Sequence, residues 1–199
     1  MTSTPNSSDH LAEAEAAAQH HPEQDFATTS LSRLADPLLV RVGEAFSYVW
    51  VVLVVLVFAN VILRYVFGKG LIQFEEAQWH LYAVGFMLGL AYVMVKDMDV
   101  RIDVLAERWS FRTRAWIEFY GLVLFLLPFI ALVLWYALPF VGYSLSIGER
   151  SDAPGGLPWR WIVKSVMVLA FLLLALAAAS RFSRVLAYLF LNQPAVEKT

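Results

Sequence analysis

The sequence predicts an all-α membrane protein with four transmembrane helices, both termini in the cytoplasm and a short interfacial helix between the second and third spans. Three observations predict this fold class. The 199-residue chain is 59% hydrophobic and only 16% charged, whereas soluble domains carry about 25% charged residues. A chain of this length cannot bury so much apolar surface in one globule. Four long apolar segments account for the excess, which argues against a soluble enzyme, a nucleic-acid-binding protein and a disordered regulator.

Residues 1–32 are predicted to form a disordered acidic tail. They contain five acidic residues, no Lys or Arg, and few large apolar side chains, so burial cannot offset the entropy lost on ordering. The segment has neither the basic start nor the apolar stretch of a secretory signal. Residues 31–44 then combine apolar side chains with Arg33 and Arg41, which is typical of a short amphipathic lead-in at the membrane surface.

The membrane domain is predicted over residues 33–190, followed by a short tail over residues 191–199. About 20 apolar residues at 1.5 Å each cross a hydrocarbon core of about 30 Å. The third apolar segment contains Pro139, near which we expect that span to end. The spans are predicted at residues 45–64, 76–95, 118–139 and 161–181.

The distribution of basic residues predicts the orientation. With a cytoplasmic N-terminus, ten of the 15 Lys and Arg residues lie on the inside and five on the outside, and the 96–115 loop contributes five of the ten. Cytoplasmic loops of membrane proteins carry such an excess of basic residues. Within residues 96–118, Val104, Leu105 and Trp109 can share one face of an interfacial helix. A regulatory or nucleotide site is the alternative for this loop, but it has no Gly-rich phosphate-binding motif.

Few residues in the chain can carry chemistry. The absence of cysteine excludes disulfides, iron–sulfur clusters and thiolate chemistry. A haem-binding membrane protein needs axial ligands that face one another, but only His80 lies in a span, while His10, His20 and His21 lie in the tail. We therefore expect no cofactor, no metal site and no enzymatic activity.

Polar residues gather where the second span begins. Glu76 and His80 are one helical turn apart, which allows either a proton relay or metal pair, or an ordinary helix start with acids at its positive dipole end. Arg64 can pair with Glu75 or Glu76 across the short connection. Gly85 and Gly89 are four residues apart and offer a smooth face to another helix. The residues considered for interface or structural roles are Asn60, Arg64, Glu75, Glu76, Trp79, His80, Gly85, Gly89, Arg101, Asp103, Arg160 and Lys164.

The middles of the four spans lack the groups that a transport site needs. Stand-alone transporters place charges, broken helices or internal repeats around a site at the membrane midplane, but these spans are nearly pure Val, Leu, Phe and Ala. The sequence therefore indicates a subunit that supports the chemistry of another protein. Two other classes are considered: a stand-alone membrane enzyme or redox carrier, and a small homo-oligomeric channel or exporter.

Several stretches in order along the chain carry a family resemblance. NVILRYVFGKG at residues 60–70 and EEAQWHLYAVGFMLGLAYVMVKDMDVRIDVL at residues 75–105 resemble the DctQ-type small membrane subunit of tripartite ATP-independent periplasmic (TRAP) transporters. RAWIEFYG at residues 114–121 and PGGLPWRWIVKS at residues 154–165 are similar to the same family. The resemblance covers residues 35–190.

The resemblance implies a three-part secondary transporter in the bacterial inner membrane. A periplasmic binding protein captures an organic acid, and a large membrane subunit moves it by an elevator-type motion driven by sodium or another ion gradient. This chain would be the small scaffold subunit beside the large one, with the bilayer and these proteins as its partners and no nucleic acid. The substrate and the coupling ion are left open.

Overall fold

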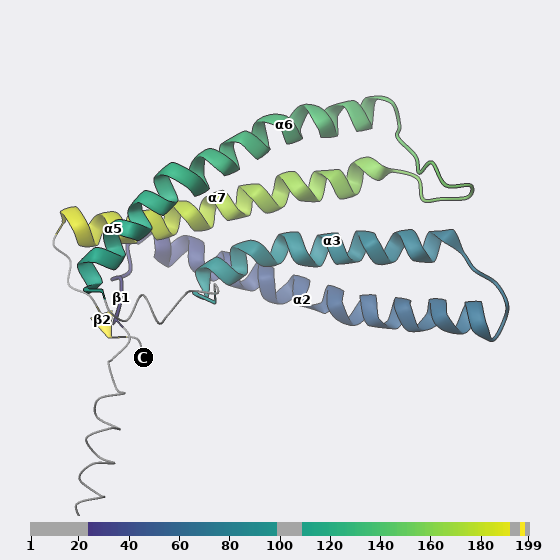
Figure 1. Cartoon of the computed structure of the whole chain (residues 1–199), viewed down its shortest axis with the longest axis horizontal. Coiled ribbons are helices and arrows are strands. Elements are labelled where there is room, and N and C mark those ends of the chain that lie inside the picture. Colours follow the sequence, from purple (N-terminus) through teal and green to yellow (C-terminus); the bar gives the residue numbers. More distant parts are fainter. Residues whose placement is uncertain (1–23, 99–108, 192–195, 198–199) are drawn as a thin grey trace, which may run out of the picture.

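A computed structural model describes residues 24–98, 109–191 and 196–197 (Figure 1). The described residues are almost entirely helical. The helices are α2 (Ser30–Tyr65), α3 (Ile72–Val95), α5 (Phe111–Gly121), α6 (Leu127–Ser146) and α7 (Arg160–Phe190). A π-helical turn, η1 (Leu122–Leu126), joins α5 to α6 without a break, and the two-residue strands β1 (Gln24–Asp25) and β2 (Val196–Glu197) pair antiparallel.

Four helices in the described part of the chain are long and apolar enough to cross a membrane, as the sequence predicts. They comprise 36, 24, 36 and 31 residues, with the segment from Phe111 to Ser146 counted as one helix. The two short strands are the only departure from an all-helical fold among the described residues. The interfacial helix expected between the second and third spans lies largely in residues 99–108, outside the described residues. The cytoplasmic placement of both termini stays a prediction.

The four long helices lie side by side in an open layer. In Figure 1, α6, α7 and α3 follow one another across the view, while α2 begins behind α7 and α3 and ends beside α3 at the edge opposite α6. Helix α7 packs against α6, α3 and the first part of α2, and α3 also packs against α2. Met94 of α3 contacts all three clusters of buried apolar residues that hold the layer together. In this arrangement every span leaves a broad apolar surface outside the protein, because 28% or less of each span is buried.

Helix α2 begins at Ser30, inside the segment 1–32 that the sequence predicts as a disordered tail. Thr29 caps α2: its side chain accepts a hydrogen bond from the Ser32 backbone N–H, and the Thr29 backbone N–H donates to the Ser32 hydroxyl oxygen. Such a capping box satisfies backbone donors at a helix start. Phe26 is buried against the rings of Phe111 and Tyr188. Residues 24–32 are therefore packed, in contrast to the expectation of disorder, and residues 1–23 lie outside the described residues.

The third long helix continues past Pro139, near which the sequence predicts the end of a span. Helix α6 runs on to Ser146, because a proline removes one backbone hydrogen bond and membrane helices tolerate that loss. The π-helical turn precedes Pro128, and the Leu127 N–H bonds the carbonyl of Leu122, five residues back. This wider turn accommodates the proline ring, which would clash with the carbonyl four residues before it in a regular α-helix.

Candidate functional site

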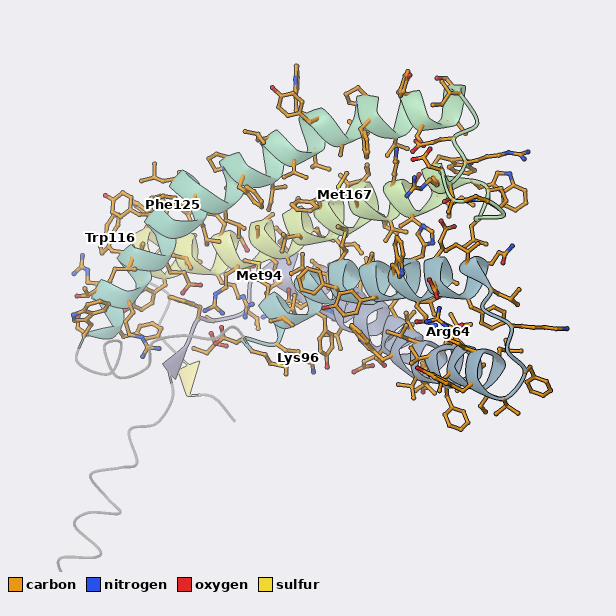
Figure 2. All side chains as sticks on the ribbon, turned by 45° about the vertical axis from the view of Figure 1, so that its right-hand side comes forward. Arg64, Met94, Lys96, Trp116, Phe125 and Met167 are labelled. Atoms are coloured by element: carbon orange, nitrogen blue, oxygen red, sulfur yellow. The ribbon has the colours of Figure 1, made fainter. Side chains whose placement is uncertain are left out.

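Charged side chains gather at the two ends of the layer. One group, here called the loop clamp, lies where the α6–α7 loop meets the start of α3, at the end of the layer that carries Arg64 in Figure 2. The other, called the arginine clamp, lies at the opposite end, where β1 and β2 pair (Figure 1). All ion pairs among the described residues belong to one of these two ends. The apolar middle of the spans carries none of them.

Glu76 is the central residue of the loop clamp. It lies in α3 close to the helix start and is only 4% exposed. Its carboxylate accepts a hydrogen bond from the Leu157 backbone N–H at 2.6 Å and another from the Ser151 hydroxyl. Because both partners belong to the α6–α7 loop, Glu76 fixes this loop to α3. Gln73 adds a second link, since its side-chain amide donates to the Gly155 carbonyl.

The α6–α7 loop is shaped to receive the Glu76 carboxylate. Gly155 has a φ of 75°, a conformation that favours glycine. A Cβ atom added at Gly156 would lie 2.5 Å from Ser151 Cβ and 3.0 Å from a Glu76 carboxylate oxygen. Gly156 therefore leaves the space in which Ser151 and Glu76 meet. The Pro-Gly-Gly sequence at residues 154–156 serves the approach of a buried acid as well as the turn.

Two further ion pairs tie this loop to α7. Lys164 pairs with Glu149, and its ammonium also lies over the Phe140 ring, 3.9 Å from the ring centre. The hydrogen bond from Lys164 lowers the pKa of the Glu149 carboxyl below its usual value. Arg160 lies 3.8 Å from the fully exposed Asp152 carboxylate, a geometry that contributes little in water. Lys164 therefore acts as the main link between α6, the loop and α7.

The remaining residues singled out from the sequence take different positions. Arg64 pairs with Glu75 and not with Glu76, and both partners are partly exposed. Trp79 is 60% exposed, and His80 is close enough to interact electrostatically with Glu76. The Asn60 side-chain oxygen is buried with no hydrogen-bond partner among the described residues. Arg101 and Asp103 lie outside the described residues.

The arginine clamp consists of Arg181 and Arg184 of α7 and the acids around them. Arg181 is 4% exposed and donates through two guanidinium nitrogens to Glu118, with one distance of 3.2 Å. The Asp97 and Asp25 carboxylates also lie 3.5 Å and 3.6 Å from its guanidinium. Arginine suits such a site because its planar fork can serve several carboxylates at once.

Arg184 lies one turn further along α7 and joins the clamp to α2. It is 7% exposed, and its guanidinium lies 3.6 Å from Asp36 and 3.9 Å from Asp25. The Ser180 hydroxyl donates to the same Asp36 carboxylate at 2.6 Å. The clamp therefore connects α2, the end of α3, α5, α7 and the segment before α2 at one place.

The arginine clamp is not predicted from the sequence. In the sequence Arg181 and Arg184 are basic residues near the end of the last predicted span, and nothing there links them to Asp36 or Glu118. One signal was available: two arginines three residues apart within a long apolar helix need partners, because buried charges are costly without them. The identity of the partners was not available, since the acids come from positions 25 to 118.

The charged side chains of the two clamps link helices and loops to one another. Among the described residues, no group of three or more His, Cys, Asp or Glu side chains is placed to hold a metal ion. Every carboxylate in the two clamps is engaged by a basic side chain, a hydroxyl or a backbone N–H. The arrangement can fix helices relative to one another at both ends of the layer.

A family model described as tripartite ATP-independent periplasmic transporters, DctQ component, matches residues 53–187. The match covers well over half of the chain and includes Glu76, Arg181 and Arg184. No curated protein matches the chain.

Proposed function

Because the chain belongs to the DctQ component family of TRAP transporters, we propose that it is the fixed scaffold subunit of an ion-gradient-driven importer of organic acids. The importer lies in the bacterial inner membrane and uses sodium as its coupling ion. A large membrane subunit carries the substrate by an elevator-type movement, and a periplasmic binding protein delivers it. The chain itself binds no substrate and catalyses no reaction.

The placement of polar groups supports the scaffold role. The ion pairs of the described residues lie at the two ends of the layer, and the apolar middle offers no charged group to hold an ion or an acid. Transport sites in membrane proteins lie near the midplane and need such groups. A part that moves against a fixed partner requires that partner to be rigid, and clamps at both ends supply rigidity.

The orientation proposed here follows from the basic residues. An even number of spans places both termini on the same side, and the excess of Lys and Arg assigns that side to the cytoplasm. The arginine clamp is then cytoplasmic and the loop clamp periplasmic. Because the chain has no cysteine, single cysteines at Gly70 and Arg108 test this directly. An impermeant thiol reagent added to intact cells should label position 70 and not position 108, and the reverse pattern would refute the orientation.

Reconstitution tests the scaffold role. Vesicles that contain the chain alone should show no uptake of organic acid above empty vesicles under an imposed sodium gradient. Vesicles with the large subunit and the binding protein should take up substrate only when the chain is also present. Uptake by the chain alone would refute the proposal and favour a stand-alone channel or exporter. Uptake by the other two proteins without the chain would refute its necessity.

A further inference from the structure

An exposed group of aromatic side chains lies on the face formed by α2 and α3. The group consists of Trp50, Tyr82 and Phe86, which are 40%, 57% and 54% exposed, together with Gly89, and it is called the aromatic patch below. The Trp50 and Tyr82 rings meet edge to face with centroids 5.7 Å apart, and Tyr82 and Phe86 are nearly parallel at 6.4 Å. The three rings therefore form one continuous surface.

The aromatic patch lies at the depth of the membrane middle. Trp50 is 14 residues from Arg64 and six from Glu44 along α2, which is about 21 Å and about 9 Å at 1.5 Å per residue. Tyr82 is about 10 Å along α3 from Glu75 and about 21 Å from Lys96. Since the hydrocarbon core is about 30 Å thick, charges bound this core at both ends and the patch lies inside it.

Lipid alone does not suit this surface. Trp50 and Tyr82 carry an indole N–H and a phenolic O–H, and neither forms a hydrogen bond with another described residue. Acyl chains offer no acceptor, so such donors are costly in the hydrocarbon core unless another protein supplies one. The neighbouring outward face of α2 carries Val51, Val54 and Val55, which are more than 60% exposed and need no acceptor.

The exposed aromatic residues of α6 lie closer to the polar boundary than the aromatic patch does. Trp135 and Tyr136 are more than 65% exposed, but they lie only about 6–8 Å along the helix from Phe140. The Lys164 ammonium lies over the Phe140 ring, so this level is close to the polar boundary. Lipid carbonyls and water can serve Trp and Tyr there, as in ordinary interface belts.

The shape of the aromatic patch fits another helix. A Cβ atom added at Gly89 would meet nothing within 4 Å, whereas one at Gly85 would lie 3.1 Å from the Trp50 ring. Gly85 is therefore used inside the chain, and Gly89 leaves an open position beside the exposed Phe86 ring. Small residues of this kind let a second membrane helix approach closely.

We propose that the aromatic patch is the seat for one transmembrane helix of the large membrane subunit. This inference rests on the proposed function. The partner helix places a side chain beside Gly89 and presents hydrogen-bond acceptors, from a hydroxyl, an amide or an unbonded backbone carbonyl, to Trp50 and Tyr82. The patch thereby selects a protein helix over lipid, and it fixes the side on which the small subunit faces its partner.

Co-purification with the large subunit tests the seat. Gly89→Leu fills the open position and should lower recovery of the large subunit by about tenfold or more, whereas wild type retains it. Gly142→Leu is the matched control, because Gly142 is also a helical glycine with nothing within 4 Å of an added Cβ, on α6 at the far edge of the layer. Both variants should melt alone at the wild-type temperature, since a Cβ atom at either position meets nothing within 4 Å.

The hydrogen bonds are tested separately with Tyr82→Phe, which keeps the ring and removes the donor, and with Trp50→Phe, which removes the donor together with the five-membered part of the indole. Each should weaken association by about threefold, the typical effect of one interhelical hydrogen bond in a membrane. A cysteine at Phe86 should cross-link to the large subunit, and one at Leu132 on α6 should not.

Equal recovery for Gly89→Leu and Gly142→Leu, with wild type retaining the large subunit, would overturn the seat and leave the scaffold role intact. A loss confined to Gly142→Leu would place the interface on α6 and also overturn it. A cross-link from Phe86 to a second copy of this chain would assign the patch to self-association. Failure of wild type to retain the large subunit would overturn both proposals.

Discussion

Replacing Arg181 by Ala should destabilise the protein more than any other single change in the arginine clamp. The guanidinium is 4% exposed and lies within 3.6 Å of three carboxylates. Its removal leaves Glu118, Asp97 and Asp25 close together without this cation. Breaking a buried ion pair by removing one member costs about 3–5 kcal/mol. Because the three acids keep 17–28% of their side-chain exposure, the lower end of that range applies.

The expected loss of about 3 kcal/mol corresponds to a fall in melting temperature of about 6–12 °C for a domain of this size. Arg33→Ala is the matched control, since Arg33 is exposed on α2 and forms one long hydrogen bond, to Thr28 at 3.4 Å. It should change stability by no more than about 0.5 kcal/mol. Arg181→Lys keeps the charge and loses the forked guanidinium, so its loss of stability should lie between those of Arg181→Ala and Arg33→Ala.

Thermal unfolding of the purified protein in detergent, followed by circular dichroism at 222 nm, measures these shifts. A double-mutant cycle with Glu118→Gln separates the Arg181–Glu118 pair from the contributions of Asp97 and Asp25. Equal melting temperatures for Arg181→Ala and Arg33→Ala would refute the reasoning, because the buried arginine would then contribute no more than an exposed one.

Three further changes test the packing and the loop clamp. Gly43→Ala should lower the melting temperature, because its Cβ would lie 2.4 Å from the Tyr92 ring. Gly89→Ala should leave the melting temperature unchanged or raise it slightly. A lower melting temperature for Gly89→Ala than for Gly43→Ala would contradict the α2–α3 packing. Glu76→Ala should speed proteolysis of the 147–159 loop without loss of helix content, and an unchanged cleavage rate would mean that other contacts hold the loop. Glu149→Gln should lower the free energy of unfolding near neutral pH. A carboxyl whose pKa is lowered by folding stabilises the fold above its unfolded pKa, and this contribution is lost as the pH falls through the folded pKa. The stability difference between variant and wild type should therefore shrink below about pH 4. A difference that grows on acidification would reverse the assigned role.

Local sequence was sufficient for the four helices and for one contact at their ends. Arg64 and Glu75 are separated by a connection of a few residues, so their pairing could be anticipated from the chain alone. Glu76 was singled out as well, but its partners Ser151 and Leu157 lie 75 and 81 residues away. Gly85 and Gly89 look alike in the sequence, and only the structure separates the glycine that receives Trp50 from the one that stays open.

The sequence by itself determined that the chain has four helices long and apolar enough to cross a membrane. The free energy of transferring a segment into hydrocarbon is a sum over its own residues, so composition and length within about 20 positions are enough. Tertiary structure decided which charges meet. Arg184 contacts Asp36 and Asp25 because α7 packs beside α2 with one particular rotation, and that rotation results from all helix–helix contacts together rather than from any one segment.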